Sequence, residues 1–257
     1  MNSIKVTFLG TGTSQGVPVI GCDCLVCLSK DTKDNRLRSS VLIETKGKIL
    51  CIDTGPDFRQ QMLNAKVRNL DAIIYTHEHK DHTAGMDDVR AFNFKQKKPM
   101  DLFLEESVED CLRKEFSYAF AKNPYPGVPQ LNLNRIRNKP FDVHGVKVIP
   151  IRLMHYKLPV FGYRIGDFAY CTDVNYISEE EKQKLQGLKV LVLTTLRKEK
   201  HISHFNLEEA LALVNDLKPS KTYLTHISHL LGEHQEVSKE LPENVELAYD
   251  GLSFNLK

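Results

Sequence analysis

A run of histidine and acidic residues directly follows an apolar segment in the first third of the chain. The segment Asp71–Tyr75 is predicted to be a strand, and the sequence Thr-His-Glu-His-Lys-Asp-His follows it at once. In an extended chain His77 and His79 would point to the same side. Asp81 and His82 could then face a second point nearby. Imidazole and carboxylate ligands suit Zn²⁺, Mn²⁺ or Fe²⁺, and two adjacent points suit a two-metal hydrolase. The alternative, a histidine-rich surface loop, would require chance clustering of the 10 histidines.

Three cysteines form a second cluster near the start of the chain. Cys22, Cys24 and Cys27 follow the pattern Cys-x-Cys-x-x-Cys. Such a loop can wrap one tetrahedral Zn²⁺ if a fourth ligand comes from elsewhere, and a zinc ion with four protein ligands is structural. Three unrelated core cysteines are a weaker interpretation, because the surrounding glycines and proline offer no strand or helix in which to bury them. The remaining cysteines stand alone: Cys51, Cys111 and Cys171.

Several single residues with metal-binding side chains lie at the ends of predicted strands. A lone histidine or aspartate at such a place is more often a capping or surface group. Together, however, these residues place ligand types at the ends of consecutive buried strands, where sites in layered α/β folds are commonly assembled. The residues are Asp53, His155, Asp173, His226 and, three positions further on, His229.

The elements that must position these residues are strands interrupted by a few helices. β-branched and aromatic runs predict strands at Ile4–Leu9, Ser40–Glu44, Lys48–Asp53, Asp71–Thr76, Met100–Leu104, Val146–Leu153, Val160–Ile165, Phe168–Thr172, Val190–Thr194, Lys221–Thr225, Val245–Tyr249 and Leu252–Leu256. Helical patterns cover Phe58–Lys66, Ala84–Phe92, Glu106–Phe116 and Asn206–Leu217. Some consecutive strands follow one another as hairpins, and others are separated by helices. This mixture favours two packed sheets with helices outside.

The bulk properties fit one large domain over residues 1–257. Residues 91–143 are the least regular part, and we expect an insertion or lid there, or equally a plain surface excursion. The net charge of +2 gives no strong case for nucleic acid or a membrane as partner. The first residues lack a signal-peptide pattern, and no run is long and apolar enough to span a membrane. We therefore expect a cytoplasmic protein whose thiols stay reduced.

These motifs together resemble the metallo-β-lactamase superfamily, whose signature Thr-His-x-His-x-Asp-His matches residues 76–82 without a gap. Within it, Gly10–Pro18, the cysteine loop, Phe161–Tyr163, Ser203-His204 and Leu224–His229 are similar to the PhnP branch of cyclic phosphodiesterases. The resemblance extends from Ile4 to Gly251. It implies a four-layer αββα sandwich with the site at one edge, between the sheets.

The resemblance also implies roles for the matching positions. One active-site metal, Mn²⁺ or Zn²⁺, would be held by His77, His79 and His155. The other would be held by Asp81, His82 and His226. Asp173 would bridge the two metals.

Four further assignments follow from the same resemblance. Asp53 would orient the histidine loop. His229 would complete a structural Zn²⁺ site with the three cysteines of the loop. His204 would be the general acid. His226 and His229 would then bind different metals from one short turn, so loss of the structural zinc should lower activity as well as stability. The sequence leaves the oligomeric state open, with a homodimer as one possibility because dimers are common in the family.

The chemistry implied is hydrolysis of a small cyclic phosphodiester, such as a phosphoribosyl 1,2-cyclic phosphate or a 2′,3′-cyclic nucleotide. Two cations about 3.5–4 Å apart could share a hydroxide that attacks phosphorus. His204 could protonate the leaving oxygen. One alternative is a nuclease of the same superfamily, of RNase Z or DNA exonuclease type, against which the low net charge argues. The sequence also leaves open a binding protein of the PqqB type with little hydrolytic activity, and a lactamase or thioesterase.

Overall fold

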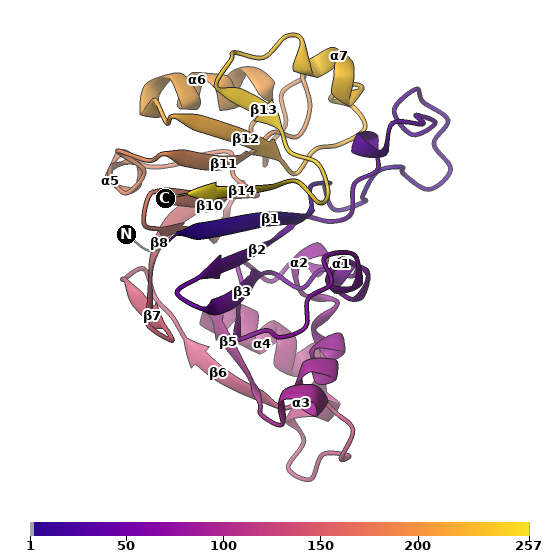
Figure 1. Cartoon of the computed structure of the whole chain (residues 1–257), viewed down its shortest axis with the longest axis vertical. Helices are drawn as coiled ribbons and strands as arrows, with labels where there is room; N and C mark the ends of the chain where they lie inside the picture. Colours follow the sequence, from indigo (N-terminus) through magenta and orange to yellow (C-terminus); the bar gives the residue numbers. More distant parts are fainter. Residues whose placement is uncertain (1–2, 257) are drawn as a thin grey trace.

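Two seven-stranded sheets pack face to face in the computed structural model, which describes residues 3–256 (Figure 1). The first sheet has the strand order β14 (Ser253–Leu256), β1 (Ile4–Gly10), β2 (Ser40–Thr45), β3 (Lys48–Ile52), β4 (Ala72–Ile74), β5 (Met100–Leu104) and β6 (Leu131–Arg135). The second has the order β13 (Val245–Leu247), β12 (Lys221–Thr225), β11 (Val190–Thr194), β10 (Phe168–Cys171), β9 (Leu158–Ile165), β8 (Val146–His155) and β7 (Phe141–Val143). Each sheet is antiparallel in one half and parallel in the other.

Helices cover the outer face of each sheet and complete the four layers. The helices on the first sheet are α1 (Phe58–Asn64), α2 (Lys80–Thr83), α3 (Arg90–Gln96) and α4 (Glu106–Glu115). Those on the second are α5 (Glu179–Gln183), α6 (Leu207–Leu217) and α7 (His234–Ser238). Short 3₁₀ helices occur at η1 (Thr32–Asp34), η2 (Met86–Val89) and η3 (Ser117–Phe120). None of the helices in residues 3–256 is long and apolar enough to cross a membrane.

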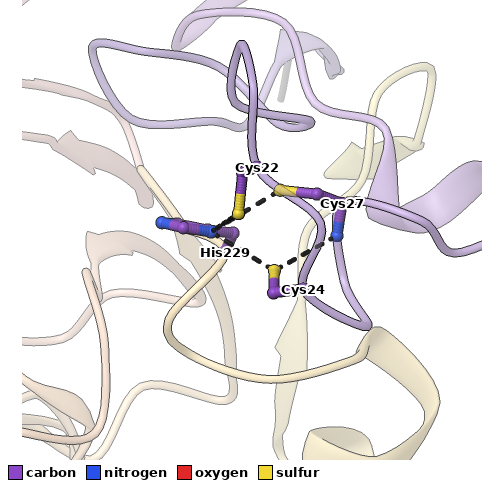
Figure 2. Close-up of side chains that lie close together, drawn as sticks. All are labelled: Cys22, Cys24, Cys27 and His229. Atoms are coloured by element: carbon purple, nitrogen blue, oxygen red, sulfur yellow. Dashed lines mark hydrogen bonds between the residues drawn. The ribbon is translucent and has the colours of Figure 1, made fainter.

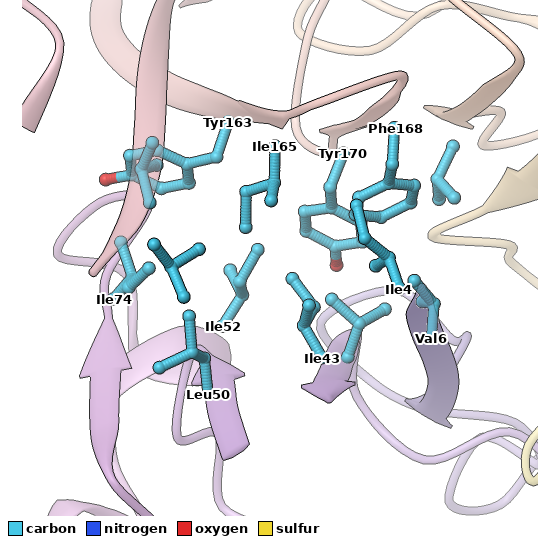
Figure 3. Packing of buried hydrophobic residues seen from close by; sticks show 14 of the residues in the cluster. Ile4, Val6, Ile43, Leu50, Ile52, Ile74, Tyr163, Ile165, Phe168 and Tyr170 are labelled. Atoms are coloured by element: carbon cyan, nitrogen blue, oxygen red, sulfur yellow. The ribbon is translucent and has the colours of Figure 1, made fainter. Parts of the chain in front are cut away.

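The main core lies between the sheets, where apolar side chains from alternate strand positions meet (Figure 3). Ile43 and Ile52 of the first sheet face Phe168 and Tyr170 of the second, and all four side chains are fully buried. Burying one such side chain contributes roughly 1.5–3 kcal/mol. The opposite faces of both sheets pack against the helices in two further apolar clusters. This burial on both faces explains the nearly continuous apolar runs of the central strands.

The predicted αββα sandwich is confirmed, and the predicted strands are found with shifts of a few residues at their ends. The sequence patterns did not predict β6 and β7. About half of the residues in these strands are polar, and both strands lie at the outer edges of their sheets. The patterns also did not predict α2, α5 and α7, each of at most five residues. A helix that short has little periodicity to detect and is held by its surroundings.

Residues 91–143 differ from the irregular insertion that we expected. This segment contributes most of α3, all of α4, two strands of the first sheet and the edge strand β7 of the second. Met100 pairs with Leu131 in parallel, so the chain leaves the sheet after β5 and returns beside it. Only residues 116–130 lie outside α-helix and strand over a longer stretch. The charged and proline-rich composition therefore concealed an ordinary strand-helix-strand crossover.

The parallel halves of the two sheets place strand ends at a common edge. β3 and β4 run in parallel, as do β10, β11 and β12. The next residues after these strands include the candidate ligands Asp53, His77, Asp173 and His226. The fold therefore gathers residues from separate parts of the chain at one end of the sandwich.

Candidate metal centre and active site

The histidine motif leaves the first sheet after β4 and turns at once into the one-turn helix α2. Tyr163 of the second sheet donates its hydroxyl hydrogen to the carbonyl of Tyr75 (2.5 Å), and the Phe161 amide donates to the Thr76 carbonyl (3.0 Å). On the other side, a Cβ on Gly55 would collide with the carbonyl oxygen of Asp81. Contacts from both sheets and a glycine in the adjacent loop therefore hold the backbone of the motif.

A first group of possible ligands contains His77, His79 and His155, whose ring nitrogens lie within 4.8 Å of one another. The Nε2 of His77 is 3.0 Å from the Nδ1 of His79. His155 Nδ1 lies 2.8 Å from the carbonyl oxygen of Ser203, which can only accept, so the proton is on Nδ1. The Nε2 lone pair of His155 is then free to bind a cation.

A second group contains Asp81, His82, Asp173 and His226, again with ligand atoms within 4.8 Å. His82 Nε2 lies 3.1 Å from an Asp81 oxygen and 3.2 Å from an Asp173 oxygen. Asp173 Oδ2 also lies 3.2 Å from His226 Nδ1. Asp173 occurs again in a third group, with His155 and His204. It therefore stands between the two sets of ligands.

Asp53 accepts hydrogen bonds from both ends of the histidine motif. Its fully buried carboxylate accepts from the backbone N–H of Thr76 and from the Thr76 hydroxyl, each at 2.8 Å, and from His82 Nδ1 at 2.7 Å. The Thr76 oxygen in turn accepts from His77 Nδ1 (2.9 Å). These bonds hold the Nδ1 protons of His77 and His82, so both Nε2 atoms present lone pairs.

The charges in the site match the requirements of a bound cation. Burial lowers the pKa of His77 and of His226, so both rings are neutral near pH 7. Burial would raise the pKa of Asp173, but the rings of His226 and His82 outweigh it and hold the pKa well below its usual value. For His82, burial lowers the pKa, yet Asp81, Asp173 and Asp53 together raise it well above its usual value. Three carboxylates around one imidazole thus favour a positive charge at this point.

The donor geometry also fits a metal. Within residues 3–256, the buried Nε2 atom of His82 has no hydrogen-bond partner, although two carboxylate oxygens lie close to it. Ligand atoms 3.0–3.2 Å apart are spaced as expected around a cation with bonds of about 2.0–2.2 Å. Imidazole nitrogens and carboxylate oxygens without sulfur suit Zn²⁺ or Mn²⁺. The residues present therefore fit divalent metal ions.

His204 lies against both groups. Its ring centroid is 4.6 Å from that of His155 and 4.8 Å from that of His226. Its Nδ1 is buried, lacks a hydrogen-bond partner among residues 3–256, and lies 3.9 Å from an Asp173 oxygen. Burial, helped by the neighbouring His226, lowers the pKa of His204 to about 3. The buried ring is therefore neutral near pH 7 unless a negative charge is placed beside it.

The cysteine loop and His229 form a separate cluster (Figure 2). The sulfurs of Cys22, Cys24 and Cys27 lie 3.3, 3.4 and 3.5 Å from His229 Nδ1. Tetrahedral zinc with Zn–S and Zn–N bonds of about 2.3 and 2.0–2.1 Å would place these atoms about 3.5 Å apart. The Cys27 N–H donates to the Cys24 sulfur and lowers the pKa of Cys24 to about 6, which favours the thiolate that zinc requires.

The turn after β12 connects this cluster to the active-site groups. His226 and His229 are separated by two residues, and Ile227 between them pairs with the start of the β1–β2 connection. The Ile227 amide donates to the Thr11 carbonyl (2.9 Å), and the Thr13 amide donates to the Ile227 carbonyl (3.1 Å). The cysteine-bearing connection therefore holds the same turn at two points.

Sequence reasoning missed several residues that contact the ligands. The Thr172 hydroxyl donates to Asp173 (2.6 Å), and the Thr13 hydroxyl lies 3.3 Å from His226 Nε2. The sequence gives a signal for Thr172, because it directly precedes a candidate ligand at a strand end. The carbonyl of Ser203, which bonds His155 across 48 residues of sequence, offers no signal in its side chain.

Comparison with known proteins identifies the family. The Beta-lactamase superfamily domain family matches residues 48–227. The chain belongs to the metallo-β-lactamase superfamily. Within it, a solved structure described as a new diphosphatase from the PhnP family has 40% sequence identity and a TM-score of 0.94, covering 100% of this chain and 98% of its own. The chain is therefore a PhnP-like member of this superfamily, whose fold implies divalent metal ions at such histidine and aspartate groups.

Two other relatives show the range of the superfamily. The octanoyltransferase of Porphyromonas gingivalis is 41% identical over 252 residues, which cover 97% of this chain and 51% of that protein. The chain thus spans about half the length of this curated relative. The Zn²⁺-bound PqqB of Methylobacterium extorquens has 18% identity and a TM-score of 0.79, covering 98% of this chain and 100% of its own, and shares the fold.

Proposed function

We propose that this metallo-β-lactamase protein hydrolyses a small cyclic phosphodiester at the two neighbouring groups of candidate metal ligands. The observation that carries the proposal is the position of His204, buried against both groups and beside Asp173. A proton donor there can serve a poor leaving group such as a ribose alkoxide. Opening a five-membered cyclic phosphodiester expels such a group and releases ring strain.

In this proposal each group of ligands holds one divalent cation. His77, His79 and His155 would hold one ion, and Asp173, which lies between the two groups, would contribute to both sites. The second ion is held by Asp81, His82 and His226. When bound, the two ions supply Lewis acidity and an ionised water at neutral pH. The cysteine loop and His229 hold a structural zinc, which stabilises the turn that carries His226.

The chain's own residues supply orientation and the proton. Asp53 and Thr76 fix which nitrogen of His77 and of His82 carries a proton, so the Nε2 lone pairs face the cations. His204 donates a proton to the leaving oxygen. Burial disfavours its charged form, but an anionic phosphoryl group beside the ring stabilises that form and works against the effect of burial.

A second candidate is hydrolysis of a diphosphate bond. It is favoured by the 40% identity to the solved PhnP-family diphosphatase over the whole chain. The same ligands and the same attack at phosphorus would serve, but the leaving group would be a phosphate, which needs little help from a proton donor. Replacing His204 therefore separates the two candidates, because it should impair diester hydrolysis far more than diphosphate hydrolysis.

The test compares bis(p-nitrophenyl) phosphate, 2′,3′-cyclic AMP and ADP as substrates of the Mn²⁺-loaded protein. Asp81→Asn removes a proposed ligand without changing its shape, and Asp101→Asn, at a partly exposed position on β5, is the matched control. We expect both diesters to be hydrolysed, with the activity lost in Asp81→Asn and kept in Asp101→Asn. Hydrolysis of ADP alone would establish the second candidate instead. Turnover of none of the three by protein with filled sites would contradict both.

A further inference from the structure

A groove opens directly beside the first group of ligands. It has a volume of about 520 Å³ and is lined by His79, His155, Tyr156, Lys157, Leu158, Ile202 and Ser203. This volume lies within the range of ordinary small-molecule sites. Because two of the proposed metal ligands line the groove, the remainder of a molecule whose phosphate reacts at the site would have room in it.

Tyr156 occupies an unfavourable backbone position at the edge of this groove. His155 pairs with Leu158 across the β8–β9 hairpin, so Tyr156 and Lys157 form a two-residue turn. Tyr156 has φ +58°, whereas φ of Lys157 is not positive. A positive φ at the first position alone is typical of a type II′ turn, in which glycine is favoured. A bulky aromatic residue there is costly, which points to a use for its side chain.

The side chains along the groove are exposed although they are large and apolar. Tyr156 is 49% exposed and Ile202 is 65% exposed. The Nζ atom of Lys157 lies 5.3 Å from the centre of the Tyr156 ring. The groove therefore presents an aromatic ring, an aliphatic side chain and one cation next to the proposed phosphate site.

One amide side chain connects the two sides of the groove. Asn175 accepts from the backbone N–H of Tyr156 (2.7 Å) and donates to the backbone carbonyl of Ile202 (3.2 Å). The adjacent Ser203 carbonyl accepts from His155 (2.8 Å). The hairpin turn, the 202–203 loop and a proposed metal ligand are thus held in fixed relation.

We propose that this groove binds the base of a nucleotide substrate, with Tyr156 and Ile202 in contact with the base and Asn175 as a positioning residue. An aromatic ring stacks on every nucleobase, and aliphatic side chains commonly complete such contacts. A sugar phosphate without a base would leave these side chains exposed. This inference rests on the proposed function and narrows its substrate class to 2′,3′-cyclic mononucleotides.

The experiment compares two cyclic phosphodiesters that differ by the base, 2′,3′-cyclic AMP and glycerol 1,2-cyclic phosphate, with the Mn²⁺-loaded protein. Tyr156→Gly removes the ring and supplies the residue that the turn favours, so the variant should be at least as stable as the wild type. Tyr156→Phe keeps the ring. Tyr125→Ala, at a 79% exposed tyrosine of the 116–130 segment, is the matched control.

We expect Tyr156→Gly to raise KM for cyclic AMP by about tenfold, as loss of one stacking contact would, with a much smaller effect on the glycerol compound. Tyr156→Phe and Tyr125→Ala should keep the wild-type ratio of kcat/KM between the two substrates. Equal effects of Tyr156→Gly on both substrates would overturn the inference. Far tighter binding of an RNA that ends in a 2′,3′-cyclic phosphate than of cyclic AMP would also overturn the inference, because the substrate would then be RNA and not a mononucleotide.

Failure of the proposed function gives a different result, namely no hydrolysis of either compound by the wild type. Calorimetric titration with adenosine 3′-monophosphate and with glycerol 3-phosphate then decides the inference separately. A preference for the nucleotide that disappears in Tyr156→Gly supports the groove as a base site. Equal affinities for both compounds, or a preference that Tyr156→Gly keeps, would overturn it.

Discussion

Asp53→Asn is the substitution that tests most sharply how the ligands are oriented. The buried carboxylate accepts three hydrogen bonds, two from Thr76 and one from His82. Asparagine has the same shape but only one acceptor oxygen, and its NH₂ group would face a donor. If the NH₂ group replaces Oδ1, the Thr76 backbone N–H loses its acceptor. If it replaces Oδ2, the Thr76 hydroxyl and His82 Nδ1 both lose theirs, and His82 is no longer held in the tautomer that presents Nε2.

The size of the effect follows from these contacts. Leaving one buried donor without a partner costs about 1–3 kcal/mol, or more for a charged group. Outer partners of metal-bound histidines typically contribute a factor of about 10–100 in affinity. We therefore expect Asp53→Asn to weaken Mn²⁺ binding by about 10–100-fold, measured by calorimetric titration, and to lower kcat when the metal is not saturating.

The matched control is Asp101→Asn, which alters an aspartate on the same sheet away from the site. It should bind Mn²⁺ like the wild type. Thermal unfolding of both variants shows whether Asp53→Asn remains folded during the titration. A folded Asp53→Asn protein with wild-type affinity would refute the argument that the Asp53 hydrogen bonds orient the ligands.

Three further predictions concern stability and the second metal cluster. Cys24→Ser should remove the proposed structural zinc and lower both Tm and activity, because that ion would hold the turn after β12. Metal analysis together with activity assays checks this, and full activity in protein without this zinc would contradict it. Burial raises the pKa of Asp250 from 3.8 to about 6, so the folded protein binds a proton more tightly there than the unfolded chain does. As the pH rises from about 4 to 6, the unfolding free energy of the wild type should therefore fall relative to that of Asp250→Asn. Urea denaturation at each pH measures this, and a constant difference between the two proteins across the range would contradict it. Asn206→Ala should cost about 1 kcal/mol by removing the capping box of α6, measured by urea denaturation, whereas Asn206→Ser should restore most of it.

The parts of the fold that could be predicted are those whose sequence pattern coincides with burial. Central strands such as β3 and β11 are apolar except at one end, because helices cover one face of each strand and the opposite sheet covers the other. The helix predicted over Asn206–Leu217 is found as α6, because its start is fixed by a capping box that lies within four residues of sequence. In edge strand β6 leucine alternates with asparagine, which is the period of a half-buried strand, but the segment is short and asparagine is a poor strand former, so the signal is weak.

The same distinction holds for the site. The motif at residues 76–82 is local, and its geometry follows from a strand that ends in a short helix. The Ser203 carbonyl and the Tyr156 turn could not be predicted, since each depends on backbone geometry formed by distant segments. The low pKa of His204 likewise results from burial among rings that meet only in the folded chain. Residue type therefore indicates the candidate ligands, whereas the hydrogen-bond partners of these residues depend on tertiary structure.

The central claim, metal-dependent attack at phosphorus in this site, is tested most directly by hydrolysing 2′,3′-cyclic AMP in ¹⁸O-labelled water. Mass spectrometry of the product shows where the new oxygen resides. The account predicts one labelled oxygen on the phosphate for each turnover, with the reaction lost in metal-free protein and in Asp81→Asn. Absence of turnover in protein with filled sites, or label found on the ribose instead of the phosphate, would contradict it.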